Sequence, residues 1–283
     1  MEPSTAEMAE TTDAVALALA RATLYSALAL GFRSPTEETI ARLGSQDAAA
    51  TLARAAVLLD PTREFGLAAI SSLLTPNSSL LTLSASHRTL FGHTARGAVP
   101  PYETEYGVEG LFQQPQEMGD LMGFYNAFGL AVNVQQHERP DHVSCECEFL
   151  SFLALKEAYA LEHEDTAMLE ETRKAERLFL HDHLARFLPA FANKLVHATN
   201  PHPYPLPLGE GEGKGDFHGF YRALAELGLK FIAAECVRFG MPAGPENLTL
   251  RPADDDRVPM ACGSGTECAA MPGACMPEEA DSV

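Results

Sequence analysis

The sequence is poor in basic residues. It holds 20 Lys and Arg against 39 Asp and Glu, which gives a formal net charge of -19 over 283 residues. Such a surface repels phosphate backbones and anionic lipids, so nucleic acid and membrane surfaces are poor partners. It attracts cationic segments such as basic peptides, although an acidic surface can also serve solubility alone. The charge balance therefore favours a basic protein segment over any polyanion as a partner.

Long apolar runs are also lacking. Near the N-terminus the longest uninterrupted one covers residues 14–20, which is far shorter than a membrane span of roughly 20 residues. The chain opens with acidic residues, where a secretory signal needs basic ones, and no two arginines are adjacent, as a twin-arginine signal of its own would require. We therefore expect a cytoplasmic protein without membrane insertion. Its six cysteines are then expected to be reduced thiols.

Motifs of common enzyme classes are missing as well. The chain has no G-x-S-x-G turn, no Walker A sequence and no G-x-G-x-x-G loop. Asp141 and His142 are adjacent, but a nucleophilic triad needs a Ser or Cys activated by a His that an acid orients, and adjacency does not supply that geometry. We expect no enzyme and no bound cofactor.

Metal ligands are present at unfavourable spacings. Cys145 and Cys147 are i, i+2 on a predicted helix, so their side chains diverge. Near the C-terminus Cys262, Cys268 and Cys275 are separated by five and six residues, unlike the C-x-x-C pairs of zinc or iron–sulfur sites. We expect bare thiols here. The alternative is a metal-handling or redox accessory protein that uses these three thiols together with one of the first two.

Strand patterns are nearly absent, whereas helical periodicity recurs over most of the chain. The pattern predicts an all-α protein with a single helical-bundle domain of eight or nine helices over residues 13–240. Residues 1–12 are expected to form a flexible N-terminus. The predicted helices cover about residues 13–32, a stretch from Ser34, 60–74, 84–91, 115–128, 141–162, 165–195 and 217–239.

Several helix boundaries are predicted from local residues. Ser34, Pro35 and Glu37 have the spacing of an N-cap, a first helical position and a capping box. Asp60 and the proline after it form a similar start, and Pro189 is expected to bend or end the helix of residues 165–195.

Two segments fall outside the helical pattern. Residues 199–216 are rich first in proline and then in glycine, which predicts a disordered insertion. Residues 241–283 are acidic and almost without helical periodicity, which predicts a mobile tail that contains the three cysteines.

The most informative stretch is E-R-P-D-H at residues 138–142. Pro140 disfavours helix in Arg139 and sets up a tight entry to the next helix. Asp141 can then cap that helix, and His142 would lie in its first turn, where the helix dipole disfavours the protonated imidazole. Taken alone, this stretch predicts a helix cap with a packed histidine.

The same stretch resembles the signature of the TorD/DmsD/NarJ family of redox-enzyme maturation chaperones. The matching residues are Glu138, Pro140, Asp141, His142, Glu148 and Phe149. Motifs upstream and downstream resemble the family in the same order: Pro101-Tyr102-Glu103, Tyr106, Phe124-Tyr125, Phe128-Gly129-Leu130, Phe179, His183-Leu184, Pro189, Phe191 and Phe220-Tyr221. The resemblance covers about residues 14–239.

The resemblance implies an all-helical chaperone that binds the catalytic subunit of a molybdopterin oxidoreductase of the dimethyl-sulfoxide-reductase type. Many members recognise the client's twin-arginine signal peptide and hold the apo-subunit for cofactor insertion, and a homodimer is one arrangement it allows. By this resemblance the leader-binding residues are Tyr102, Glu103, Tyr125, Pro140, Asp141 and His142, and Glu148 and Phe149 support them. Carboxylates suit the guanidinium groups of such a leader, and aromatic side chains suit its apolar stretch.

The sequence also departs from the family. It has no Trp, and Phe187 stands where several relatives place one after H-L. The glycine-rich insertion and the cysteine-containing tail are additional to the common core. A nitrate reductase and a periplasmic dimethyl sulfide, selenate, chlorate or hydrocarbon dehydrogenase type enzyme are equally compatible clients.

Overall fold

The computed structural model of the chain describes residues 5–67, 79–92, 96–107, 114–133, 138–199 and 218–251. Helices dominate this part of the chain, which otherwise holds three isolated β-bridges and no strand. The elements are α1 (Thr5–Phe32), α2 (Glu37–Leu43), α3 (Gln46–Leu59), α4 (Leu80–Phe91), the 3-10 turn η2 (Glu103–Glu105), α5 (Gln114–Ala127), α6 (Val143–Glu162), α7 (Thr166–Phe179), the π-helical turn η4 (Leu180–Leu184), α8 (Ala185–Ala198) and α9 (His218–Arg238). The predicted all-α fold class is confirmed.

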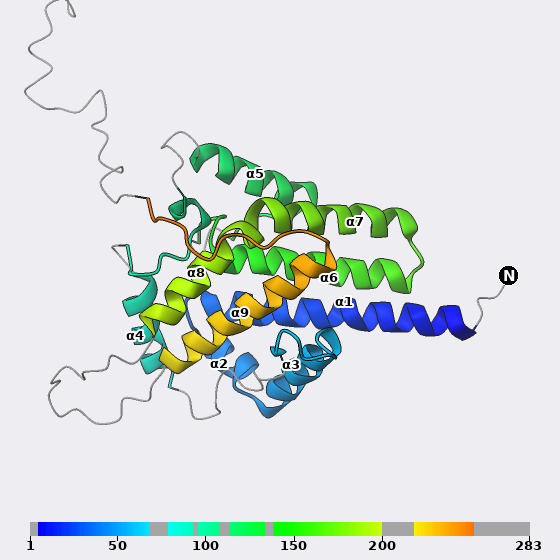
Figure 1. Ribbon diagram of the computed structural model, residues 1–283, viewed down its shortest axis with the longest axis horizontal. Helices are drawn as coiled ribbons and strands as arrows, with labels where there is room; N and C mark the ends of the chain where they lie inside the picture. The colour runs from blue at the N-terminus through cyan, green and yellow to red at the C-terminus, as the bar shows by residue number, and fades with distance from the viewer. Residues whose placement is uncertain are drawn as a thin grey trace, which may run out of the picture. The chain divides into compact units, whose positions relative to one another are not determined.

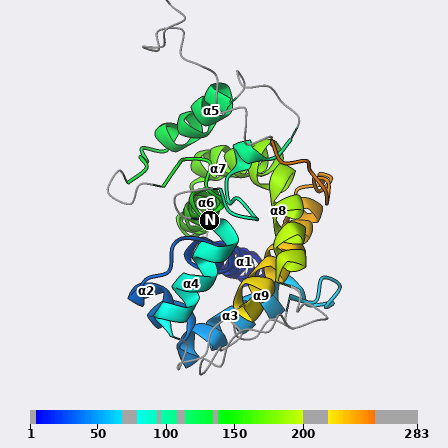
Figure 2. The same cartoon turned by 90° about the vertical axis from the view of Figure 1, so that its left-hand side faces the viewer.

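Helices α1 and α6 form the centre of the bundle (Figure 1). α6 packs against both α1 and α7, while α8 pairs with α9, and α9 also contacts α1. In Figures 1 and 2 α5 lies on the outer side of α7, away from α1. Helix α6 also contacts the η4 turn, and Glu103 of η2 reaches the same turn at His183.

Helix α1 is apolar enough to be confused with a membrane span. By length and composition alone its residues Thr11–Phe32 could cross a bilayer, with a mean hydropathy of 1.6, but 67% of the apolar window is buried inside the protein. Arg21 lies in this stretch and is fully buried. A buried guanidinium must be paired, and three carboxylates from other helices surround it.

Those carboxylates belong to Glu157 of α6, Glu176 of α7 and Glu235 of α9. The Arg21 guanidinium lies 2.7 Å from Glu235 and 3.1 Å from Glu176, and it also donates to Glu157. Burial raises the pKa of the Glu176 carboxyl to about 7, against the opposing effect of Arg21. Arg21 thus joins four helices through one charged cluster.

The predicted start of the second helix is wrong. Helix α2 is capped by Thr36, whose capping box is completed by Thr39 and not by Glu37, so Ser34 and Pro35 precede the cap. A new helix, α3, begins only three residues after α2 ends, with Ser45 accepting a hydrogen bond from the Ala48 amide at 3.0 Å. The first helix also starts earlier than predicted. Residues 5–12, which were expected to belong to the flexible N-terminus, are part of α1.

Asp60 also ends a helix instead of starting one. It is the C-cap of α3, and its buried carboxylate accepts the backbone amides of Phe65 and Leu67 at 3.4 and 3.1 Å. Residues 61–66 are therefore a turn, which contradicts the helix predicted from Asp60. The remainder of that predicted helix lies largely outside the described residues.

Pro189 does not end a helix, contrary to one of the two outcomes predicted for it. The long helix predicted over residues 165–195 is interrupted at η4, and Pro189 lies inside α8. Because proline has no N–H, the Ala185 carbonyl loses its helical donor. The Gly244 amide donates to it instead, at 3.0 Å.

This contact belongs to a segment that the sequence assigns to the tail. Residues 241–251 follow α9 back over the helices, and Met241, Leu248 and Leu250 pack against the core. Leu250 forms a bridge with Tyr106. The predicted insertion at residues 199–216 lies outside the described residues except for Thr199. Residues 252–283, with the three cysteines of the predicted tail, lie entirely outside them.

Candidate functional site

Backbone hydrogen bonds join two of the stretches that resemble the chaperone family, Pro101-Tyr102-Glu103 and the E-R-P-D-H segment of residues 138–142. The Glu103 amide donates to the Asp141 carbonyl at 2.8 Å, and the Val143 amide donates to the Pro101 carbonyl at 2.9 Å. The Tyr125 hydroxyl adds a bond of 2.9 Å to the Pro140 carbonyl. Residues far apart in the sequence therefore meet at the start of α6.

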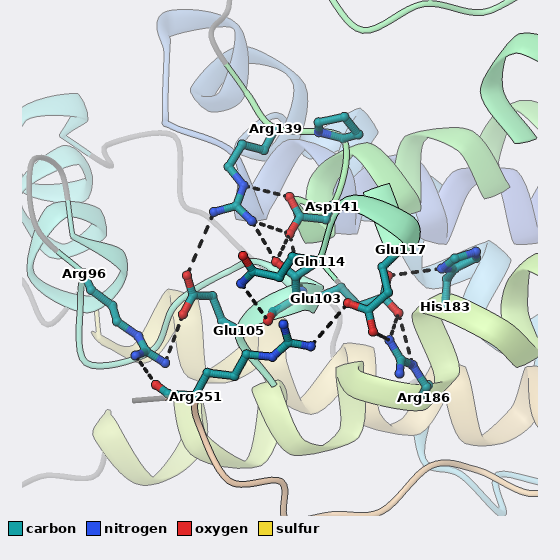
Figure 3. A network of polar contacts seen from close by, with 12 residues as sticks. Arg96, Glu103, Glu105, Gln114, Glu117, Arg139, Asp141, His183, Arg186 and Arg251 are labelled. Carbon is teal, nitrogen blue, oxygen red and sulfur yellow. Dashed lines mark hydrogen bonds and ion pairs between the residues drawn. The ribbon is translucent and has the colours of Figure 1, made fainter. Parts of the chain in front are cut away.

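Asp141 is fully buried and does not cap α6, so that prediction is wrong. Its carboxylate takes two bonds from the Arg139 guanidinium, at 2.9 and 2.7 Å, and one from the Thr104 hydroxyl at 2.7 Å (Figure 3). A buried carboxylate needs such donors, because burial of an unpaired charge is costly. Its partners are all within the chain.

Arg139 is the residue whose role the sequence did not reveal. Its guanidinium lies 4.4 Å from the centre of the Tyr102 ring, bonds Thr104 at 2.7 Å and comes within 3.9 Å of Glu105. We call Tyr102, Thr104, Glu105 and Asp141 the Arg139 cage. Arg139 belongs to the E-R-P-D-H motif, but only the fold brings the residues of the cage around its side chain.

The cap of α6 is His142. Its Nδ1 accepts the Ser144 amide at 3.1 Å and lies 2.7 Å from the Ser144 hydroxyl. Burial lowers the pKa of the imidazole to about 3, with smaller contributions from His87 and Arg139. The ring is therefore neutral at physiological pH, as its use as an acceptor requires, and its 3.7 Å approach to Glu138 is not an ion pair.

Glu103 is likewise buried and internally paired. One carboxylate oxygen lies 3.1 Å from His183 Nδ1, and the other accepts the Arg186 guanidinium at 2.7 Å. Arg186 and Arg251 each lie 3.4 Å from Glu117 of α5 (Figure 3). Glu103 thus links η2 to the η4–α8 turn. Through Glu117 the network reaches α5 and Arg251, the last residue of the segment 241–251, which we call the C-terminal segment.

Glu146, in the first turn of α6, is a further buried acid, to which the sequence assigned no part in the site. Within the described residues no donor reaches either of its carboxyl oxygens. Burial, followed by the nearby charges of Glu103 and Asp141, raises its pKa well above the ordinary value. The neutral acid is the form that this environment holds.

An open groove lies beside the start of α6. Its volume is about 340 Å³. We call it the α6 groove, lined by Arg33, Tyr125, Leu130, Ala131, Val132, Asn133, Glu138, Ser144, Cys145, Glu148, Phe149 and Phe152. Tyr125 and Phe149 stack edge to face in its wall at 5.1 Å, Glu148 is exposed and Glu138 is half-buried. The groove thus combines an apolar wall with two carboxylates and the guanidinium of Arg33, which is paired with Glu38 at 3.0 Å.

The thiols near this groove are poor nucleophiles. Burial raises the pKa of the Cys145 thiol to about 12, with Glu138 adding to the effect, and the buried Cys147 thiol is shifted in the same direction. Both carry free thiols. Across the described ranges no group of three His, Cys, Asp or Glu residues is placed to hold a metal ion; the three tail cysteines lie outside those ranges.

The structure thus brings the predicted site residues together but gives them different exposures. Tyr125, Glu148 and Phe149 line the α6 groove, where only Glu148 is exposed and the two aromatic rings are nearly buried, whereas Tyr102 is half-buried before η2 and Pro140 is half-buried on the loop before α6. Asp141, His142 and Glu103 are buried beneath that loop. Glu138, Cys145 and Phe152 were missed as lining residues, although two of them stand at helical spacing from Glu148 or Phe149.

Comparison with known proteins gives a consistent family. The family model "Nitrate reductase delta subunit" matches residues 44–193. The chaperone protein TorD of Vibrio cholerae is 30% identical over 217 residues, which cover 75% of this chain and 88% of that protein. The perchlorate reductase assembly chaperone protein of Dechloromonas aromatica is 31% identical over 176 residues, 60% of this chain and 75% of the relative.

A shorter match extends the set. The chlorate reductase assembly chaperone protein of Ideonella dechloratans is 38% identical over 91 residues, 32% of this chain and 43% of that protein. No solved structure matches the chain significantly. The relatives are named as chaperones and not as enzymes. With its all-α fold, the chain therefore belongs to the TorD/NarJ family of molybdoenzyme maturation chaperones.

Proposed function

We propose that this chaperone binds the twin-arginine leader of the catalytic subunit of a molybdopterin oxidoreductase in the α6 groove. With the leader bound in this way, the chaperone holds the apo-subunit in the cytoplasm for cofactor insertion before export or assembly. The names of the relatives, which assemble chlorate and perchlorate reductases, support a reductase subunit of this kind as the partner.

The observation that carries the proposal is the chemistry of the groove. A leader of this kind combines two guanidinium groups with an apolar stretch. The half-buried side chains of Leu130, Val132 and Phe152 offer apolar surface beside the nearly buried rings of Tyr125 and Phe149. Glu138 and the exposed Glu148 offer carboxylates. Arginine pairs well with carboxylates, and peptide grooves in general bind apolar side chains on such walls. The net charge of -19 adds attraction over a longer range.

The other residues assigned by resemblance have supporting roles in this proposal. Pro140 and Asp141 lie in the loop before α6 that adjoins the groove, and Tyr102 lies in the segment before η2, which is bridged to that loop at His142. Glu103 and His142 hold that loop through His183, Arg186 and the start of α6. Neither of them lines the groove, so we assign them no contact with the leader.

A charge placed in the groove tests the proposal. Val132 is a half-buried lining residue, so Val132→Lys puts a cation where the leader would lie. Val237→Lys makes the same change on α9, where the side chain is 68% exposed and outside the groove. The probe is a fluorescent synthetic peptide with two adjacent arginines followed by a leucine- and alanine-rich stretch.

We expect Val132→Lys to weaken peptide binding by about tenfold or more, which corresponds to about 1.4 kcal/mol. Val237→Lys should bind as the unmodified chain does, and both variants should keep their helical circular dichroism. Equal affinities for the two variants would remove the α6 groove as the leader site.

A further inference from the structure

The Arg139 cage is a complete binding site for a guanidinium ion. Two nitrogens of Arg139 bond the two oxygens of Asp141 at 2.9 and 2.7 Å, and one also bonds Thr104 at 2.7 Å. The Tyr102 ring covers the guanidinium at 4.4 Å, and Glu105 lies 3.9 Å away. Bidentate pairing with a carboxylate and contact with an aromatic face are the two interactions that distinguish arginine from lysine.

The loop around this cage has hydrogen bonds that do not involve the occupant. The surrounding loop is fixed by the Glu103 amide on the Asp141 carbonyl, the Val143 amide on the Pro101 carbonyl and the Tyr125 hydroxyl on the Pro140 carbonyl. None of these bonds involves the Arg139 side chain. Without it, Asp141 would keep the Thr104 hydroxyl, at 2.7 Å.

The occupant is also accessible. The Arg139 side chain is 39% exposed, while the Asp141 side chain beneath it is fully buried. The next residue before it, Glu138, lines the α6 groove, and Tyr125 lines the groove while bonding Pro140. The cage therefore adjoins the groove along the chain.

We propose that the cage is a binding site for a client arginine, and that Arg139 occupies it as an internal substitute in the free chaperone. This inference rests on the proposed leader binding and specifies how one arginine is read. When the leader enters the α6 groove, one of its guanidinium groups replaces that of Arg139, which moves out into solvent. Asp141 is paired with a guanidinium both before and after the exchange, so neither end state contains an unpaired buried carboxylate.

The exchange has a thermodynamic consequence. One guanidinium replaces another, so the cage itself adds little affinity, but it discriminates against lysine, whose ammonium group cannot bond both carboxylate oxygens in the same fork. The cage is free only for the fraction of time that Arg139 is out, and the apparent affinity for the leader is reduced by that fraction. Removing Arg139 therefore strengthens leader binding.

Two variants and two probes test this. Arg139→Ala empties the cage, and Arg54→Ala is the charge-matched control, since Arg54 is exposed on α3 and bonds only Thr51 among the contacts described. The twin-arginine peptide and a version with two lysines are titrated against each protein. Ethylguanidinium chloride is added to the proteins without peptide, with ethylammonium chloride as its control, and their thermal melting is followed.

We expect Arg139→Ala to bind the twin-arginine peptide about tenfold or more tightly than the unmodified chain, with a smaller gain for the twin-lysine peptide and none for Arg54→Ala. Ethylguanidinium should raise the melting temperature of Arg139→Ala in a saturable manner, and ethylammonium should not. The ethylguanidinium result does not depend on the leader, so it separates failure of the cage from failure of the proposed function.

Unchanged or weaker binding of the twin-arginine peptide to Arg139→Ala would overturn the inference, and so would the lack of an ethylguanidinium effect. If Arg139→Ala loses its helical structure, Arg139→Gln is tested in its place. Failure of both variants to fold would also overturn it, because Arg139 would then be a structural part of the loop. If Val132→Lys still abolishes peptide binding in these cases, the proposed function stands without the cage.

Discussion

Gly244 should be irreplaceable because of the proline opposite it. A Cβ atom added at Gly244 would lie 2.3 Å from the Ala185 carbonyl oxygen and 2.5 Å from that of Arg186. Both contacts are with backbone atoms, which cannot rotate away. Gly244→Ala must therefore move the C-terminal segment and break the 3.0 Å bond from its amide to the Ala185 carbonyl, whose helical donor is already missing at Pro189.

The size of the effect follows from these two losses. A lost hydrogen bond costs about 1 kcal/mol net, and an orphaned buried acceptor adds about 1–3 kcal/mol. Replacing Gly by Ala restricts the unfolded chain, which returns roughly 0.4–1 kcal/mol. We expect Gly244→Ala to lower the free energy of unfolding by about 1–3 kcal/mol. Gly219→Ala is the control, because a Cβ there meets nothing within 4 Å.

The assay is urea denaturation followed by circular dichroism, combined with a double-mutant cycle. Pro189→Ala restores an N–H that can bond the Ala185 carbonyl within α8, so Gly244→Ala should cost less in that background. Amide exchange at Gly107 and Arg251, which bond Thr249 and Glu105, should accelerate in Gly244→Ala. If Gly244→Ala is as stable as Gly219→Ala, or if Gly244→Ala and Pro189→Ala are strictly additive, then the Gly244 amide does not compensate for the donor missing at Pro189.

Two further predictions concern the charged cluster around Arg21. Arg21→Met leaves three buried carboxylates without their shared cation and should lower the free energy of unfolding in urea by roughly 3–5 kcal/mol, whereas exposed Arg54→Met should change it by less than about 0.5 kcal/mol; equal effects would show that the cluster does not stabilise the fold. The Glu176 carboxyl has a pKa of about 7 in the folded chain, above its ordinary value of 4.5, so folding binds a proton and stability falls as pH rises from about 4.5 to about 7. Glu176→Gln cannot ionise and should gain stability relative to the unmodified chain between pH 5 and pH 8; an identical difference at both pH values would contradict this assignment.

The helices could be predicted from the sequence because periodicity is a local property. Their boundaries were less predictable, since one residue type serves opposite purposes. Asp60 before a proline has the pattern of a helix start, but it ends α3 because its carboxylate accepts amides that follow it, from Phe65 and Leu67. At α6 a histidine caps the helix, and Asp141 is occupied by Arg139.

The candidate site could be located from the sequence, but its internal pairing could not. The motif places Arg139 two residues from Asp141, and only the turn at Pro140 brings the guanidinium onto the carboxylate. Glu103 meets His183 and Arg186 across 80 and 83 residues, a separation that no local pattern reports. Arg21 had a local signal, because it is the single charged residue in the largely apolar stretch of residues 14–32, but its three acidic partners lie on other helices.

If the leader lies in the α6 groove, site-specific photo-crosslinking should capture it there. A benzoyl-phenylalanine is placed at Val132 in the groove or, as the control, at the exposed Val237 of α9. Illumination with the labelled twin-arginine peptide should give a covalent adduct from position 132 that excess unlabelled peptide suppresses, and none from position 237. An adduct from position 237 that the unlabelled peptide suppresses, with none from position 132, would contradict the account.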